Sequence, residues 1–383
     1  LLLLPAALYV PAIQKALVQY SERWIGEHTG MSVSVGGLSL RFPLDLSIDN
    51  VTVAHNDNDT LAAVGSVRVR VALLPLLRKR ADISDIRLDD VRFNYLSEDS
   101  SMLLGVAAGR LQLDGGAVDL AKGKVQVENL SLTQADISLV LRDVVDTDTV
   151  QPVVLPDWEI NIASIDLSDI AYTMYMPPLI DTLRVGLPHA SVTAGKVSLA
   201  RQQVDVGRLA IDRGNYRYIA RHMADADSVA ADSVQTVAAF LPWQISVADV
   251  WLADNSAVYE TGTKPATEGF DAEHIAADRI CLSLSSVYNR GSELRLMVDS
   301  LSMNERSGIA VTRAAGGFAM EENRITVSDF TLFTPYSDVR VEADVDMRFF
   351  DDNPEAPIYA VIESNLALSD VEKFYPDVAH FYI

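Results

Sequence analysis

The segment Val33–Leu40 reads VSVGGLSL, and Leu46–Val53 reads LSIDNVTV shortly after it. In both, apolar residues alternate with polar ones, two residues intervene, and the alternation resumes. Side chains of a strand point alternately to its two faces, so the extra residue would turn every later apolar side chain outward in a straight strand. The inserted pairs, Gly36-Gly37 and Asp49-Asn50, are types found at bulges and sharp bends. The pattern therefore predicts strands that bend and keep one apolar face.

The same irregular pattern recurs along the chain. Full copies begin at Val125, Ile160, Val204, Ile245, Leu296 and Ile325, and weaker copies with one alanine begin at Val106 and Val192. The other inserted pairs include Gly109-Arg110, Glu128-Asn129, Gly195-Lys196, Gly207-Arg208, Asp299-Ser300 and Ser328-Asp329. Simple alternation occurs in any β-sandwich, but a shared slip at the same place favours a repeated bent strand. Many such strands would build one curved sheet with a common inner face.

A longer duplication supports the repeat. LPDWEINIASIDLSD, from Leu155 to Asp169, resembles LPWQISVADVWLAD, from Leu241 to Asp254, so that Trp158 matches Trp243 85 residues later. Each copy follows a stretch rich in Asp, Ser, Thr and Val. These stretches are predicted to be exposed loops between modules.

The composition restricts the function. The net charge of −22 accompanies 49% hydrophobic residues and a mean hydropathy of +0.14, which argues against disorder and against binding to phosphate backbones. The single cysteine, Cys281, excludes an internal disulfide and a Cys-based zinc site. No strong catalytic motif occurs, and the six histidines are dispersed, each expected at the surface or in a turn. We therefore expect no enzyme, cofactor or metal; a carbohydrate-active β-solenoid would need clustered carboxylates on one face, whereas the acids here lie at turns.

The two ends carry helical signals. The apolar run Leu1–Ile13 fits part of a membrane helix, with a signal-peptide core or a buried helix as alternatives. Ile13, Leu17, Tyr20 and Trp24 then follow at helical spacing, which predicts an amphipathic helix after the anchor.

A second helix is predicted near the other end. Ser369 and Glu372 form a capping-box pattern, and Pro376 is expected to end the helix. Neither end has the flanks of a complete chain, so we expect a part of a longer protein. The basic stretch Arg78–Arg80 is expected either to contact anionic lipid headgroups or to end a short helix.

Two stretches near the start of the chain resemble the N-terminal region of the AsmA/TamB-like superfamily of Gram-negative envelope proteins, and two later stretches resemble its TamB-type repeats. They are VPAIQKALVQYSERWIGEHTGMSVSVGGLSLRFPLDLSIDNVTV, DTLAAVGSVRVRVALLPLLRKRADISDIRLDDVRFNY, ITVSDFTLFTPYSDVRVEADVDM and LALSDVEKFYP. The resemblance implies a single N-terminal inner-membrane span and a periplasmic body folded as a long U-shaped sheet with an apolar lumen, a β-taco. It also implies a role in phospholipid transport to the outer membrane, or in the assembly of outer-membrane or autotransporter β-barrels as in a translocation and assembly module.

The sequence thus predicts a mainly β, antiparallel-rich, elongated and curved sheet with an N-terminal helix. The expected parts are residues 1–30 as anchor and helix, 31–145 as AsmA-like repeats and 146–383 as further groove repeats. Expected partners are membrane lipids, the inner membrane and an outer-membrane barrel of the BamA/TamA type, with no nucleic acid. Candidate lipid-groove residues are Val33, Val35, Leu46, Ile48, Val67, Val69, Val71, Val125, Val127, Ile160, Ile162, Ile165, Leu167, Ile245, Val247, Val250, Leu252, Leu296, Val298, Ile325, Val327, Val339 and Val341.

Overall fold

The computed structural model divides the chain into two units. Residues 1–143 with 155–174 form the first unit, and residues 144–154 with 175–383 form the second. The residues that the structure describes are 10, 12–16, 18–20, 31–41, 45–55, 60–71, 81–97, 102–119, 123–142, 157–176, 180–220, 243–351 and 356–376. The predicted boundary between residues 145 and 146 lies outside them.

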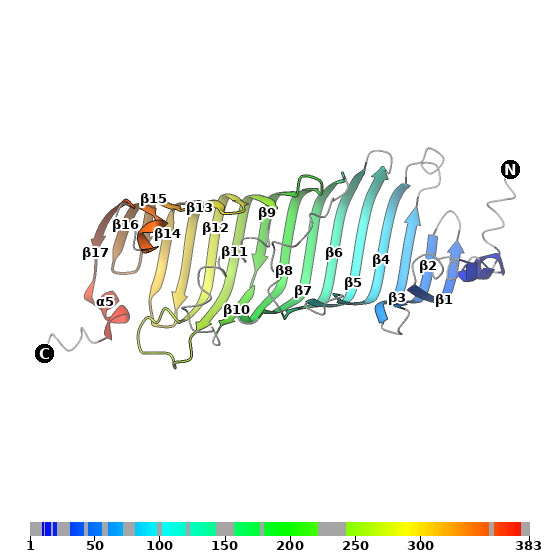
Figure 1. Cartoon of the computed structure of the whole chain (residues 1–383), viewed down its shortest axis with the longest axis horizontal. Helices are drawn as coiled ribbons and strands as arrows, with labels where there is room; N and C mark the ends of the chain where they lie inside the picture. Colours follow the sequence, from blue (N-terminus) through cyan, green and yellow to red (C-terminus); the bar gives the residue numbers. More distant parts are fainter. Residues whose placement is uncertain are drawn as a thin grey trace. The chain divides into compact units, whose positions relative to one another are not determined.

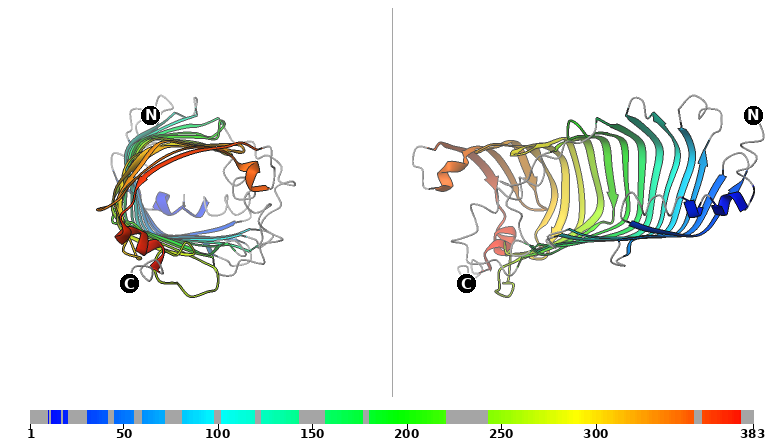
Figure 2. Two further views of the ribbon diagram at one scale, coloured as in Figure 1. Left: turned by 90° about the vertical axis from the view of Figure 1, so that its left-hand side faces the viewer. Right: turned by 45° about the vertical axis from the view of Figure 1, so that its right-hand side comes forward.

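The fold is mainly β with a short N-terminal helix, as predicted, and Figure 2 shows the long strands as curved ribbons. The strands of the first unit are β1 (Met31–Arg41), β2 (Asp45–His55), β3 (Thr60–Val71), β4 (Ala81–Leu96), β5 (Met102–Asp119), β6 (Lys124–Leu141) and β7 (Glu159–Met176), the last of these up to Met174 (Figure 1). The second unit contains β8 (Ile180–Ser198), β9 (Gln203–Asp212), β10 (Asn215–Ala220), β11 (Gln244–Thr261), β12 (His274–Arg290), β13 (Glu293–Glu305), β14 (Ala310–Glu321), β15 (Arg324–Phe333), β16 (Asp338–Asp346), η2 (Met347–Asp351), β17 (Ile358–Asn365) and α5 (Leu368–Phe374).

Pairing in the first unit is mostly antiparallel. Strands β1 to β6 pair in sequence order as antiparallel neighbours. Strand β7 instead runs parallel to its neighbour β6. Two hydrogen bonds indicate this direction: Glu159 N donates to Gly123 O at 2.9 Å near the start of both strands, and Ser164 Oγ donates to Asn129 Oδ1 at 2.9 Å further along both. Among the described strands of this unit, β6 and β7 are therefore the one parallel pair.

The second unit contains a matching exception. Strands β8 and β9, and then β11 to β17 in order, are antiparallel neighbours. However, β9 and β10 both lie parallel to β11, and β10 is antiparallel to β8. Strands β7 and β11 are the two copies of the duplicated sequence. The Asp-rich stretches before the two copies, which the sequence predicts to be exposed loops, lie outside the described residues.

The predicted slips coincide with interruptions of the strand ladders. In the first unit the ladders skip the facing pairs Gly36 with Asn50, Gly65 with Asp90, and Gly109 with Gln134, and the register is unchanged on either side. The extra residue of one strand is thus matched by an extra residue of its neighbour. In the second unit several ladders shift register instead, as between β12 and β13 at Asp299. The prediction of an interruption at each inserted pair is confirmed, but most pairs in the first unit are matched bends and not one-sided bulges.

The break between β9 and β10 is filled by one polar side chain. Asn255, which is fully buried, donates to the carbonyl oxygens of Ala253 at 2.9 Å and Ile211 at 3.3 Å, and lies against Gly214. A Cβ on Gly214 would lie 2.4 Å from Asn255 Oδ1, so only glycine fits there. Asn255 stands at the position that Ile170 takes in the other copy of the duplication.

The predicted C-terminal helix is present as α5, and Pro376 follows it. The predicted capping box is wrong, because Ala367 is the N-cap and no side chain caps the helix. Instead Asp370, within α5, binds the turn between β15 and β16.

The N-terminal helix covers residues 12–16 and 18–20. Gln14 Nε2 donates to Leu40 O at 3.3 Å, and Gln14 is buried, whereas Ile13 and Tyr20 of the predicted apolar face are exposed. Leu17, Trp24 and most of the predicted anchor lie outside the described residues. Among those that are described, the structure contains no helix with the length and apolar character needed to cross a bilayer.

Candidate functional site

The predicted groove residues of the first unit fall on one face of neighbouring strands. Strand pairing places Ile48 beside Val67, and Leu46 beside Val69. Each of these side chains is half-buried, while Arg68 and Arg70 between them are exposed, as alternation predicts. Val71 ends β3.

These residues belong to apolar rows that cross the unit from β1 to β6 without a polar break. Each row contains six residues that are cross-strand neighbours. The rows are Val33, Val53, Ala62, Phe93, Val106 and Ile137; Val35, Val51, Val64, Val91, Ala108 and Ala135; Leu38, Ile48, Val67, Leu88, Leu111 and Leu132; and Leu40, Leu46, Val69, Ile86, Leu113 and Leu130. Five intervals of about 4.8 Å give a row about 24 Å long. An acyl chain occupies about 15 Å, half of the hydrocarbon thickness of a bilayer, so one row exceeds its length.

The second unit contains a corresponding row. It passes through Ala190, Ile211, Leu252, Leu282, Leu301, Ala314, Leu332 and Val339. The predicted residue Val250 is the partner of Leu284, which is the partner of Val298, and Leu296 is joined through Phe318 to Val327.

The remaining candidates extend the same faces. Strand β7 contributes Ile160, Ile162, Ile165 and Leu167; β6 contributes Val125 and Val127; and the other positions are Ile245 and Val247 on β11, Ile325 on β15 and Val341 on β16. All are half-buried except Val127, which is 8% exposed.

In the part of the chain that the structure describes, the apolar face lacks a conventional buried core. Among the described residues, the largest fully buried side chain is Asn255, and the buried apolar residues are mostly alanines. In the four rows of the first unit, only Ala108 and Ala135 are buried. Large aliphatic side chains in a closed core are usually inaccessible to water. The half-buried rows therefore form an apolar surface that can take up further apolar groups.

The opposite face is polar and is crossed by ion pairs. Asp89 accepts hydrogen bonds from Arg87 Nε at 2.8 Å and from Arg110 Nε at 2.9 Å, and from Ser66 Oγ at 3.3 Å. Burial raises the pKa of the Asp89 carboxyl, but the hydrogen bonds from the two arginines outweigh it and hold the pKa below its usual range. The two faces of the strands thus differ sharply in polarity.

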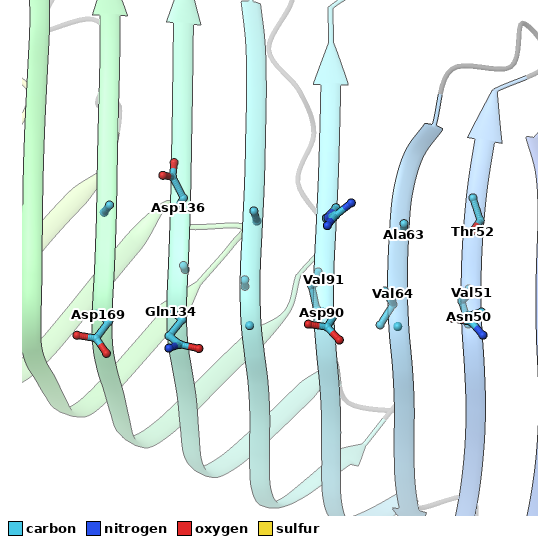
Figure 3. A pocket seen from close by; sticks show the side chains of 17 residues that line it. Asn50, Val51, Thr52, Ala63, Val64, Asp90, Val91, Gln134, Asp136 and Asp169 are labelled. Carbon is cyan, nitrogen blue, oxygen red and sulfur yellow. The ribbon is translucent and has the colours of Figure 1, made fainter.

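A transverse line of left-handed residues crosses this polar face in the first unit. Asn50, Asp90, Gln134 and Asp169 have φ between 51° and 55°, on β2, β4, β6 and β7 (Figure 3). Glycine faces three of them, on β1, β3 and β5. A Cβ on Gly65 would lie 3.0 Å from Asp90 Cβ, so the left-handed side chain takes the space beside a glycine.

The line of left-handed residues borders a hollow of about 900 Å³. Small residues such as Ala63, Ala107 and Ala171 also line the hollow. Its polar lining residues Thr52, Arg92 and Asp136 each follow a member of an apolar row in the sequence, so their side chains lie on the polar face. The described residues contain no group of His, Cys, Asp and Glu that could hold a metal ion. The geometry of the line is explained by strand bending, without a ligand.

Sequence reasoning missed an aromatic group in the second unit. Tyr218 of β10 and Tyr259 of β11 are cross-strand partners whose rings stack, with centroids 5.3 Å apart and planes 9° apart. Tyr216 lies two residues before Tyr218, on the same face of β10. On the opposite face, Arg217 of β10 donates to Glu260 Oε1 of β11 at 3.2 Å. The alternation of tyrosine with arginine in NYRYIA was the signal that could have found this group.

One histidine differs from the prediction. His274 begins β12 directly after a turn, but it is buried, 8% exposed, and its Nδ1 lies 3.1 Å from Asp271 Oδ2. The backbone amide of Thr267, together with that of Glu273 and the side chains of Thr267 and His274, lowers the pKa of Asp271 to about 2 despite the opposing effect of burial. This group fixes the turn before β12. The basic stretch Arg78–Arg80 lies outside the described residues.

Neither a scan against protein-family models nor a search of the curated proteins found a match to this chain.

Proposed function

We propose that this chain is an inner-membrane-anchored periplasmic protein whose strands form a U-shaped apolar groove for phospholipid transport between the inner and outer membranes. The observation that carries the proposal is the set of half-buried apolar rows that run across neighbouring strands in register. In this proposal the protein is not an enzyme and needs no cofactor. The compartment and the anchor are inferred from the resemblance of the sequence to AsmA/TamB-like envelope proteins.

The energetics favour a continuous apolar path. Each methylene group costs about 0.8 kcal/mol in water, so two chains of about 16 carbons would cost on the order of 25 kcal/mol. An apolar row longer than an acyl chain removes most of that barrier. Because the rows run across the strands, a lipid could pass from one strand to the next without leaving the apolar face.

The matched interruptions favour a groove over a flat sheet. Left-handed residues bend a strand, and in the first unit they face interruptions of the neighbouring strands. Neighbouring strands that bend at the same level would curve together. Their apolar faces would then turn toward one another and line a common trough.

The test replaces one residue within a row by a charged residue. Ile48→Asp places a carboxylate between Leu38 and Val67, whereas Ser47→Asp places the same charge on the opposite face of the same strand. Lipid bound by the purified protein would be measured by mass spectrometry, with circular dichroism as a check of folding. We expect Ile48→Asp to lose most of the bound phospholipid and Ser47→Asp to retain it.

Equal lipid content in both folded variants would overturn the proposed groove. The absence of phospholipid from the wild-type protein after incubation with vesicles would also overturn it. Val127 is a poor choice for this test, because its burial means that a charge there would destabilise the fold.

A second candidate function is an assembly scaffold for outer-membrane or autotransporter β-barrels, and strand β17 favours it. Within the second unit β17 pairs only with β16 among the described strands, and all eight of its residues are exposed, Ile362 at 66%. An exposed edge strand can add a strand of a partner. Crosslinking from Ile362→Cys to a barrel protein, with no bound lipid, would favour this function over transport.

A further inference from the structure

Strand β17 forms an exposed edge of the second unit. All eight of its residues are exposed, so both of its faces are bare, and among the described strands of this unit only β16 pairs with it. Proteins commonly protect such an edge with a proline, a lysine or a bulge. The sequence of β17, IYAVIESN, contains neither proline nor lysine, and its pairing with β16 runs without a register shift. An edge of this kind is a template for a further strand.

One hydrogen bond fixes which backbone groups of β17 face its free side. Asp346 N donates to Pro357 O at 3.1 Å, so these two facing residues form a hydrogen-bonded pair. In an antiparallel ladder such pairs alternate with pairs that are not hydrogen-bonded. Because the ladder is regular, the odd-numbered residues of β17 bond to β16. The backbone groups that point away from β16 therefore belong to Ile358, Ala360, Ile362 and Ser364.

These four outward residues are placed symmetrically about Val361. A second β17 lying antiparallel, with a two-fold axis through Val361, would face Ile358 with Ser364 and Ala360 with Ile362. Each such pair exchanges N–H···O bonds in both directions, so the two strands would share about eight backbone hydrogen bonds. Any other shift of the two strands leaves at least one outward residue without a facing partner. The strand thus complements itself along its whole length.

The side chains match in the same register. The outward residues share a face with the valines of β16, as Ile362 does with its partner Val341. Facing residues of paired strands lie on one face of a sheet. The apolar row through Val341 and Ile362 would therefore continue into the second copy at its Ala360. On the opposite face, Tyr359 of one copy would lie against Glu363 of the other.

The charges of the edge are compatible with this contact. Glu363 is the one charged residue of β17, and its partner on β16 is Arg340. The two Glu363 residues of the pair would lie about 14 Å apart, four positions along the strands and one strand across. That distance exceeds the screening length of about 8 Å at physiological salt. The net charge of −22 opposes association at longer range, so added salt should strengthen it.

We propose that β17 pairs with β17 of a second copy of this chain, antiparallel and about a two-fold axis at Val361, so that the sheets of two second units become continuous. A second copy is the occupant that these observations favour, because it brings the same four outward residues in the matching order. A strand of another protein would have to reproduce that order. The inference goes beyond the proposed transport and does not depend on it, since it requires strand pairing alone.

Disulfide formation tests the register, in a Cys281→Ser background that removes the exposed native thiol. In Val361→Cys the two cysteines would face each other at the axis as a non-hydrogen-bonded pair, with Cα atoms about 4.5 Å apart and within reach of a disulfide. Tyr359→Cys, on the same face of the same strand, is the control, because its two copies would be about 14 Å apart. After mild oxidation we expect covalent dimers of Val361→Cys and none of Tyr359→Cys.

Sedimentation velocity of the purified chain without lipid measures the association itself. The wild-type protein is expected to form a species of twice its mass of 41.8 kDa. Ile362→Pro removes an outward N–H and leaves the bonds to β16 in place, so it should raise the dissociation constant about ten-fold or more. Ile362→Thr keeps that N–H and should dimerise nearly as the wild type does. Circular dichroism checks the folding of both variants.

Each possible result decides the matter. A monomeric wild-type protein, equal crosslinking of Val361→Cys and Tyr359→Cys, or a dimer that Ile362→Pro leaves unchanged would overturn the proposal. Crosslinking of Val361→Cys to an added outer-membrane barrel, and not to itself, would also overturn it and would favour the scaffold function. If Ile362→Pro does not fold, the two cysteine variants still decide.

The groove and the dimer can fail separately. The variant Ile48→Asp, which tests the groove in the first unit, should dimerise like the wild-type protein even where it has lost its lipid. A dimer without lipid would leave the pairing standing and the groove refuted, and lipid bound by a monomer would show the reverse.

Discussion

At the scale of single residues, the bends of the first unit depend on pairs of a left-handed residue and a glycine. Asn50, Asp90 and Gln134 have positive φ, which costs a residue with a side chain about 1 kcal/mol or more. The facing glycines accept that side chain because they have no Cβ. The sequence showed the glycines, but Gln134 is a residue type that few would place in a left-handed conformation.

Two neighbouring glycines provide a direct test. A Cβ on Gly36 would lie 3.0 Å from Asn50 Cβ and 3.2 Å from Asp49 O, whereas a Cβ on Gly37 would have its nearest neighbour at 3.8 Å. We expect Gly36→Ala to destabilise the protein by about 1–3 kcal/mol through overpacking. Gly37→Ala should be nearly neutral or slightly stabilising.

The measurement is the midpoint of urea unfolding, monitored by far-UV circular dichroism for both variants. Equal midpoints in Gly36→Ala and Gly37→Ala would show that Asn50 does not restrict the residue facing it.

At the scale of elements, the helix α5 is attached to the sheet by one buried carboxylate. Asp370, 5% exposed, accepts hydrogen bonds from Thr334 Oγ1 at 2.6 Å, Ser337 Oγ at 2.7 Å and Lys373 Nζ at 3.2 Å. A ring contact between Phe374 and Phe270, with centroids 5.3 Å apart, holds the same helix against the loop before β12. The helix signal was readable in the sequence, but its attachment was not, because Thr334 and Ser337 are more than 30 residues away.

The attachment of α5 should depend on pH and on Asp370. Burial raises the pKa of Asp370, but hydrogen bonds from Thr334, Ser337 and Lys373 outweigh it, so the net pKa is lower than the usual 3.8. The stabilisation is therefore complete above about pH 4 and is lost as the pH falls through the lowered pKa. Asp370→Asn should weaken the attachment by about 1–3 kcal/mol, because it removes a charged acceptor.

Hydrogen exchange of the α5 amides at neutral pH measures this effect. Ser369→Ala, which changes the exposed neighbouring residue, serves as the control and should exchange like the wild type. Unchanged α5 exchange in Asp370→Asn would contradict the attachment.

At the scale of the whole molecule, strong negative charge and exposed apolar surface occur together. The net charge of −22 at neutral pH favours repulsion between copies of the chain, although the apolar rows are only half-buried. Hydrophobic surface of this kind associates when the charge is removed. On the proposed function, this charge would keep separate copies soluble while the apolar rows remain available to lipid.

This balance predicts association near the isoelectric point. At about pH 4.5, the sequence pI, we expect light scattering to rise steeply compared with pH 7, and bound lipid or detergent to suppress the rise by covering the apolar rows. Scattering at pH 4.5 that ignores added detergent would indicate association through polar surfaces.

Features that depend only on neighbours in the sequence could be predicted, whereas features that depend on distant residues could not. Three features of the first kind are as predicted: the interruption at Asp49-Asn50, the outward side chain of Arg68, and the position of Val67 on the apolar face. The tyrosine pair was missed because Tyr218 and Tyr259 meet only through the parallel pairing of β10 with β11.

By itself, the sequence determined the mainly β fold, the places where strand ladders are interrupted and the face on which the apolar side chains of the repeated strand pattern lie, because alternation and residue type act over a few residues. Only the tertiary structure decided that β7 pairs parallel to β6 and β11 parallel to β9. It also decided that glycine faces Asn50, Asp90 and Gln134, and that Asn255 fills the break between β9 and β10. These features depend on which strands become neighbours. That choice is made by contacts between residues far apart in the chain, which no local pattern contains.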